Sequence, residues 1–446
     1  MMTTLRNRLF ATLFAILVLS PFTAGLVLAV EIERVKSSGE IEAWLVRDHT
    51  NPIISMRFAF RGGSALDPEN LGGLANMAAS LLDEGAGDID SQAFQSTLED
   101  LVISLRFDAR RDALGGRLVS LTENRVTAFN LLKLALTRPR FDPEPVERIR
   151  SQILAGIRQD SENPGAIASK SLFKRLFPSH PYGRLRSGTA KSVAAITRDD
   201  LVAFASSRMA KNNLKIGVVG DITAQSLAAV LDDVFGGLPD TAAPWDIPEA
   251  EPQSDGRTQV VEKDIPQSSI VFADRGLKRK HPDFYTAYLM NYVLGGGGFT
   301  SRLYDTIRDK RGLAYSVYSG LHPLERAGLI FGGAGTTNAK VSETLSLLRQ
   351  EWARMADNGV TEQELADAKT YQTGSYPLRF ASSGSIAAML VGIQMEDLGI
   401  DYMDRRNSLI EAVTLEDVNR VAKTLLRPDR LSIVVVGKPN GVKSTP

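Results

Sequence analysis

Apolar residues recur with two periods along the first half of the chain. Residues 42–46 and 53–60 alternate or run apolar in the manner of β-strands. Residues 72–82 form a segment with little polar surface, which is typical of a buried helix. The pattern predicts an α+β fold, in which helices and sheets are both present.

An internal repeat is the strongest sign of organisation. A predicted helix after Thr197 leads into a β-branched strand that ends at Gly220, and a helix after Thr414 leads into one that ends at Gly437. The offset between the copies is constant and has no gap. Both threonines are predicted N-caps, because acidic residues follow in the first turn. Chance similarity of short apolar segments does not explain agreement across a cap, a helix and a strand.

The segment between the two copies reads as a linker. Residues 241–257 are rich in proline and polar residues and show little periodicity. We therefore expect two α+β domains, at 31–240 and 258–446. The repeat predicts that they share one architecture.

Four glycines, Gly295 to Gly298, follow an apolar helical run over residues 284–294. A phosphate-binding loop would instead follow a strand and would carry a lysine before a serine or threonine. The glycines are therefore interpreted as a helix C-cap and turn. Thr300 or Ser301 is predicted to cap the next helix.

Two polar side chains after these glycines are candidates for chemistry. Arg308 lies in the helical run over residues 300–310, and Tyr315 lies in the strand predicted over residues 313–318. From the residues alone, a solvated helix position accounts for Arg308. Strand packing with a hydroxyl at the rim accounts for Tyr315.

Composition excludes several classes of function. The 446 residues are 43% hydrophobic and 23% charged, as is ordinary for globular proteins. Lys+Arg and Asp+Glu both number 52, so net charge attracts neither nucleic acid nor an anionic membrane. The absence of cysteine excludes disulfides, thiol nucleophiles and cysteine-ligated zinc.

The chain shows no helix-borne zinc motif. Its four histidines are His49, His180, His281 and His322. No two of them have the i,i+4 spacing that directs two imidazoles at one ion, so surface or turn packing is the expected role. Acidic pairs such as Glu362 and Glu364 are attributed to a solvated helix face.

The N-terminus has the pattern of an export signal. Arg6 and Arg8 precede an uncharged apolar run over residues 9–28, and Ala29 ends a small-residue cleavage pattern. Residues 1–29 are thus a predicted signal peptide, which implies a periplasmic protein with no stable membrane association after cleavage. An uncleaved membrane anchor is the alternative, because the apolar run is about long enough to span a bilayer.

A set of short motifs spans nearly all of the predicted mature chain. It comprises Gly63-Ser64, Gly73-Leu74-Ala75, Asn163-Pro164, His180-Pro-Tyr-Gly183, Gly188-Thr189, Ser301-Arg302-Leu303 and Arg311-Gly-Leu-Ala-Tyr315. Together these motifs resemble the pitrilysin/insulinase family of zinc peptidases, and most closely its mitochondrial processing peptidase-like branch. The resemblance implies two homologous α/β-sandwich domains, each a mainly antiparallel sheet covered by helices. Such a pair forms half of a clam-like chamber.

The sequence departs from the family where the metal should bind. The inverted motif H-x-x-E-H follows Gly-Leu-Ala in the family enzymes, but Asn76, Ala79 and Ser80 occupy those positions here. The distal glutamate ligand is expected near Ala155-Gly156. Zinc needs three protein ligands and a base for its water, so the resemblance implies no cofactor in this chain and no peptidase activity by the chain alone.

The resemblance also implies a role for the C-terminal half. Arg308 and Tyr315 match an arginine and a tyrosine that act in the active site of a zinc-bearing partner, and Gly295 to Gly298 match a glycine-rich loop of the chamber wall. The implied protein is an exported non-catalytic subunit of a heterodimeric zinc metallopeptidase that binds extended peptides. A binding or assembly subunit without a role in proteolysis is the alternative. A peptidase with a rewired metal site is a third hypothesis.

Overall fold

Two β-sheets organise residues 31–445, the part of the chain that a computed structural model describes. The first sheet contains β1 (Glu33–Lys36), β2 (Glu42–Arg47), β3 (Ile53–Arg61), β4 (Ser104–Ala109), β5 (Ala113–Leu121) and β6 (Leu214–Gly220). The second sheet contains β7 (Thr258–Glu262), β8 (Gln267–Arg275), β9 (Ala314–Pro323), β10 (Gly328–Thr337) and β11 (Ser432–Gly437). The predicted signal peptide, residues 1–29, lies outside the described residues.

The two sheets share one strand order and one set of strand directions. The first runs β1-β2-β6-β3-β5-β4 and the second runs β7-β11-β8-β10-β9, so equivalent strands take equivalent places once β1 is set aside. The pairs β2–β6 and β7–β11 are parallel, and the other pairs are antiparallel. The predicted α+β class is confirmed, and both sheets are mainly antiparallel.

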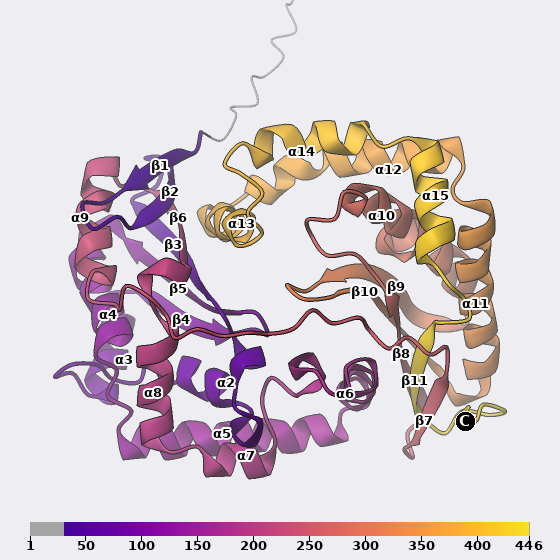
Figure 1. Cartoon of the computed structure of the whole chain (residues 1–446), viewed down its shortest axis with the longest axis horizontal. Helices are drawn as coiled ribbons and strands as arrows, with labels where there is room; N and C mark the ends of the chain where they lie inside the picture. Colours follow the sequence, from indigo (N-terminus) through magenta and orange to yellow (C-terminus); the bar gives the residue numbers. More distant parts are fainter. Residues whose placement is uncertain (1–30, 446) are drawn as a thin grey trace, which may run out of the picture. The chain divides into compact units, whose positions relative to one another are not determined.

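Helices cover both sheets (Figure 1). Those of the N-terminal half are α2 (Leu74–Ala79), α3 (Ser91–Asp100), α4 (Arg125–Thr137), α5 (Pro143–Glu162), α6 (Pro164–Leu176), α7 (Ala190–Ala195), α8 (Arg198–Arg208) and α9 (Ala224–Phe235). Those of the C-terminal half are α10 (Phe284–Asn291), α11 (Val341–Asn358), α12 (Glu362–Gly374), α13 (Ser383–Met395), α14 (Tyr402–Glu411) and α15 (Leu415–Leu425). The predicted caps Thr197 and Thr414 are confirmed, because each begins its helix with a capping box.

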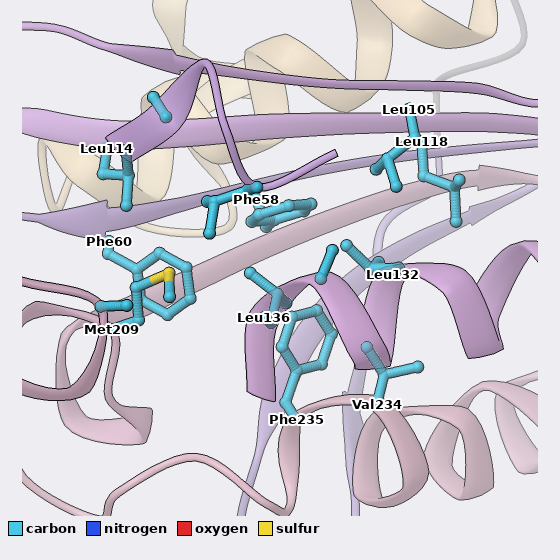
Figure 2. Packing of buried hydrophobic residues seen from close by; sticks show 14 of the residues in the cluster. Phe58, Phe60, Leu105, Leu114, Leu118, Leu132, Leu136, Met209, Val234 and Phe235 are labelled. Carbon is cyan, nitrogen blue, oxygen red and sulfur yellow. The ribbon is translucent and has the colours of Figure 1, made fainter. Parts of the chain in front are cut away.

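One face of the first sheet is apolar and forms the core of that half. Phe58, Leu105 and Leu118 turn from β3, β4 and β5 toward Leu132 of α4 and Phe235 of α9 (Figure 2). Successive side chains of a strand point to opposite faces. The residues next to these three in sequence therefore point to the other face of the sheet.

Each half of the chain contributes one helix to the sheet of the other half. Helix α6 packs on β8 and β11, where Leu172 and Phe173 share a buried cluster with Val434. Helix α13 packs in turn on β3 and β6. There the side-chain amide of Gln394 donates a hydrogen bond of 2.8 Å to the carbonyl of Ile216. This exchange ties the two halves together at two separate places.

Several predicted elements differ from the structure in extent. The buried helix predicted over residues 72–82 is α-helical only from Leu74 to Ala79. Its start is fixed by the carboxylate of Asp67, which accepts hydrogen bonds from the backbone amides of Gly73 and Ala75. The predicted linker, residues 241–257, contains no helix or strand. The domain limits 31–240 and 258–446 stay a prediction.

Among residues 31–445, no single helix is long and apolar enough to cross a membrane. One pair of segments, Glu362–Phe380 and Ser383–Met395, satisfies the length and composition test together, but it is bent by 116°.

Candidate functional site

Arg308 and Tyr315 lie on neighbouring elements and line the same pocket. Arg308 belongs to the last turn of a π-helix, Tyr304–Asp309, and Tyr315 is the second residue of β9. The pocket has a volume of about 550 Å³, and its wall includes both side chains. Tyr315 is 81% exposed. The structure thus places the two sequence-predicted residues together, and their catalytic role stays a prediction.

The backbone that carries Arg308 is wound more widely than an α-helix. The amide of Lys310 donates a hydrogen bond of 2.9 Å to the carbonyl of Asp305, which is the i,i+5 spacing of a π-helix. Gly312 then turns the chain with a φ of +58°. Its amide donates a hydrogen bond of 2.8 Å to the carbonyl of Arg308. Short π-helical turns are frequent at functional sites. This geometry therefore favours a functional role for the side chain of Arg308.

The helix before Arg308 begins differently from the prediction. The sequence predicts that Thr300 or Ser301 accepts a hydrogen bond as the N-cap, but the hydroxyls of both residues donate instead, to the carbonyls of Gly297 and Gly298 at 3.0 and 2.8 Å. The predicted side-chain cap is therefore not formed, although Ser301 directly precedes the helix and its carbonyl accepts a hydrogen bond of 2.9 Å from the amide of Asp305. The two hydroxyls close the preceding turn instead.

Three aromatic rings surround the guanidinium of Arg308. Its Cζ lies 4.6 Å from the ring centre of Tyr304, 5.7 Å from that of Tyr315 and 5.9 Å from that of Phe299. All three distances are within the range of cation–π attraction. The rings therefore lie around the guanidinium, and the side chain of Arg308 also forms part of the pocket wall.

The cations on either side of Arg308 are neutralised. Arg302 pairs with Glu364 and Lys310 pairs with Asp305, both at 2.6 Å. Within residues 31–445, Arg308 forms no ion pair. A guanidinium offers five donors in a fork that matches a carboxylate or two carbonyl oxygens. Arg308 can accordingly receive such a group from a ligand.

Glu364 does not lie on a solvated helix face, contrary to the sequence-based prediction. Its carboxylate accepts hydrogen bonds of 2.7 and 2.6 Å from the Nε and Nη2 atoms of Arg302. It also accepts one of 2.8 Å from the backbone amide of Thr361. Burial alone raises the pKa of Glu364, but these hydrogen bonds outweigh it and lower the pKa to about 2. The ion pair thus anchors the segment that carries Arg308 to α12.

The glycines of the run from Gly295 to Gly298 are not equivalent, because some are buried against neighbouring residues and others are exposed. Gly295 is buried, and a Cβ atom there would lie 2.3 Å from the Oγ of Ser319 on β9. Gly298 is exposed, has a φ of +58° and has no atom within 4 Å of an added Cβ. None of Gly295 to Gly298 lines the pocket of Arg308. Their contact with a substrate stays a prediction.

The positions of the degenerate zinc motif lie on α2 and at its end, and not on the wall of that pocket. Ala79 is buried and apolar. The hydroxyl of Ser80 donates a hydrogen bond of 3.0 Å to the carbonyl of Asn76. Gly156, at the expected distal ligand position, is exposed on α5. These residues offer no imidazole or carboxylate, so they do not fit zinc. Across residues 31–445, no group of three or more His, Asp or Glu side chains is placed to hold a metal ion.

Sequence reasoning did not find the aromatic partners of Arg308. Tyr304 precedes Arg308 by four residues, which is the spacing of neighbours on one helix face. Phe299 directly follows the glycines and is 75% exposed. The sequence alone could have predicted the contact between Tyr304 and Arg308, because it follows from their spacing. The contact between Phe299 and Arg308 depends on the course of the intervening turn, which only the folded chain shows.

Known proteins resemble this chain over most of its length. The family profile described as "Peptidase M16 inactive domain" matches residues 195–371. A crystal structure of a peptidase M16 inactive domain from Pseudomonas fluorescens is 31% identical, covers 93% of this chain and 99% of its own, and has a TM-score of 0.86. The non-peptidase homolog YmxG of Helicobacter pylori is 29% identical, over 87% of this chain and 90% of its own. A protease structure from Helicobacter pylori shares the fold, with a TM-score of 0.82 at 19% identity, and covers 92% of this chain and 100% of its own.

These likenesses place the chain in a family. It belongs to the peptidase M16 family. The residues at α2 and the likeness to an inactive domain and a non-peptidase homologue support a non-catalytic member of that family.

Proposed function

We propose that this protein is the exported, non-catalytic subunit of a heterodimeric zinc metallopeptidase. In this proposal, the chain binds extended peptides in the periplasm and forms half of a clam-like chamber. A homologous partner that carries H-x-x-E-H supplies the other half and the zinc. The observation that carries the proposal is the shared pocket of Arg308 and Tyr315, in a chain whose own motif positions hold no metal ligand.

The two side chains have complementary tasks in this proposal. The exposed hydroxyl of Tyr315 donates a hydrogen bond to the carbonyl oxygen of the scissile peptide bond, where negative charge develops. Arg308, held by Tyr304, binds a backbone carbonyl or a terminal carboxylate of the peptide. Gly296 and Gly298, which are exposed, contribute backbone to the chamber wall.

The test measures cleavage of an unstructured fluorogenic peptide by this chain, by an H-x-x-E-H-bearing homologue, and by their mixture. We expect the chain alone to be inactive and the mixture to be faster than the homologue. Loss of one donor to an oxyanion costs about 10²–10³ in rate. Tyr315→Phe and Arg308→Ala should each remove most of the gain.

Two control variants test whether the loss of rate is specific to Arg308 and Tyr315 or follows from any change to a nearby exposed side chain. Tyr318→Phe removes a hydroxyl from an exposed tyrosine of the same strand, and Lys310→Ala removes a nearby cation that already has a partner. Both controls should keep the gain. A mixture no faster than the homologue would contradict the site-completing role, and full activity in both site variants would leave this chain a binding or assembly subunit.

A further inference from the structure

Three arginines stand in one row across the first sheet. Arg57 of β3 lies directly opposite Arg117 of β5, and Arg117 lies directly opposite Arg106 of β4. Residues in register on neighbouring strands point to the same face of a sheet. This face is opposite to the one that buries Phe58 and Leu118 (Figure 2). We call Arg57, Arg117 and Arg106 the arginine row.

The row is electrostatically unfavourable in the chain by itself. Like charges directly opposite each other on neighbouring strands destabilise a sheet. Arg106 has one acidic neighbour, Asp83, at 3.3 Å. Burial, and then the charge of Arg117, lower the pKa of Arg57. In the described part of the chain, neither Arg57 nor Arg117 forms an ion pair. The charge of Asp108 raises the pKa of Arg57, but this effect is smaller than those of burial and of Arg117, so the repulsion within the row is only partly offset.

A cavity of about 520 Å³ adjoins the row and adds further arginines. Its wall includes Arg57, together with Arg110, Arg111 and Arg186. The Cζ of Arg111 lies 4.2 Å from the ring centre of Phe173, which holds its guanidinium against an apolar surface. Helix α13 closes one side of the cavity.

Two of the three carboxylates on this wall are already paired or hydrogen-bonded, and the partner of Asp108 is itself on the wall. Asp108 pairs with Arg110 at 3.2 Å. Asp112 accepts hydrogen bonds from the hydroxyl of Tyr182 at 2.7 Å and from the amide of Glu325 at 3.1 Å. The third acid of the wall is Glu396, whose pKa is raised by burial. Arg57, Arg111, Arg117 and Arg186 form no ion pair with any residue in 31–445, so this surface carries a local excess of positive charge.

The surface is reachable from the edge of the sheet. β4 is an outer strand, and its residues Arg106 and Asp108 are exposed. Neighbouring strands are about 4.8 Å apart, so the row spreads its charges over about 10 Å. Several separate carboxylates match this spread better than one compact anion does, and the guanidinium fork matches a carboxylate.

We propose that the arginine row and the adjoining cavity bind the carboxylate groups of an acidic peptide segment. This inference rests on the proposed function, in which the chain binds peptides, and it names the class of peptide that the chain selects. The site is distinct from the pocket of Arg308 and Tyr315, because the two walls share no residue. An acidic segment supplies the counter-charges that the sheet lacks.

The test uses the chain alone, and it therefore does not depend on a partner. Fluorescence anisotropy at low ionic strength compares a labelled ten-residue peptide that contains four glutamates with the same peptide carrying glutamines. We expect the glutamate peptide to bind about tenfold tighter or better, because each ion pair to arginine adds a charge-assisted hydrogen bond. Arg57→Gln and Arg117→Gln should each weaken its binding about tenfold. Arg34→Gln, at an exposed arginine of the same sheet outside the row, should leave binding unchanged.

A second measurement distinguishes a binding role from a structural one. Arg117→Gln removes a like charge from the row, so the melting temperature of this variant should rise while peptide affinity falls. A fall in both quantities would assign the row a structural role. Equal affinity for the glutamate and glutamine peptides, or tighter binding of tripolyphosphate than of the glutamate peptide, would overturn the proposal. Failure here leaves the rate test of Arg308 and Tyr315 intact, and failure of that test leaves this binding assay intact.

Discussion

Arg302 and Glu364 meet in a two-pronged ion pair, with Nε–Oε1 at 2.7 Å and Nη2–Oε2 at 2.6 Å. The side chain of Arg302 is 9% exposed and that of Glu364 is 30% exposed. Breaking one partner of a largely buried pair leaves the other charge uncompensated. The pair holds the π-helical segment of Arg308 against α12, so its loss should disturb both stability and the site.

Glu364→Gln should lower the free energy of unfolding by about 1–2 kcal/mol at pH 7, after allowance for the partial exposure of the carboxylate. The folded-state pKa of about 2 lies below the ordinary 4.5. The unfolded state therefore takes up the proton first, and this contribution is lost as the pH falls from about 4.5 to about 2. Urea denaturation at several pH values measures both effects. Glu362→Gln on the same helix turn is the control, and an equal loss there would contradict the assignment.

Gly295→Ala should be destabilised by about 2 kcal/mol, because the new methyl would lie 2.3 Å from the Oγ of Ser319 and 2.8 Å from the Cδ1 of Leu303. Gly320→Ala on β9 meets no atom within 4 Å and should be close to neutral. Thermal unfolding of both variants tests this contrast. Equal melting temperatures would show that the glycine run is not held by this close approach.

Gly217→Ala should loosen α13 from the first sheet. An added Cβ would lie 2.8 Å from both the carbonyl oxygen of Ala387 and the Cβ of Leu390. We expect faster amide hydrogen exchange over residues 383–395 and a loss of about 1–3 kcal/mol. Gly392→Ala, on the same helix, meets no atom within 4 Å. This control should exchange no faster than the wild type, and unchanged exchange in Gly217→Ala would contradict the packing.

Gly156→Ala should raise the stability of the protein by about 1 kcal/mol, because alanine is the better helix former at an exposed position. Gly156 lies inside α5, and an added Cβ meets no atom within 4 Å. The melting temperature measures the change. A loss of stability would contradict the open surroundings of this position.

Arg308→Lys tests the shape of the cation separately from its charge. Lysine keeps the charge but loses the planar fork and its stacking on Tyr304. If the fork binds peptide carbonyls, the gain of the mixed peptidase assay should fall about tenfold or more. Full gain with lysine would show that charge alone is required at this position.

The sequence by itself determined the elements and their repetition. Thr197 and Thr414 begin equivalent helices, and Gly220 and Gly437 end equivalent strands, because caps and β-branched runs are local signals. It also pointed to Arg308 and Tyr315, through a family resemblance carried by short motifs. The absence of imidazole and carboxylate at Asn76, Ala79 and Ser80 needed no structure, since ligation depends on residue type.

Only the tertiary structure decided which distant residues meet. The pairing of Arg302 with Glu364, the exchange of α6 and α13 between the sheets, and the opposition of Arg57 and Arg117 all join segments remote in the chain. Helix and strand patterns report which face of an element is buried, but they do not report which element covers it. The strand register fixes the arginine row, and register follows from the packing of the whole sheet. The two walls that define the candidate sites therefore appear only in the folded chain.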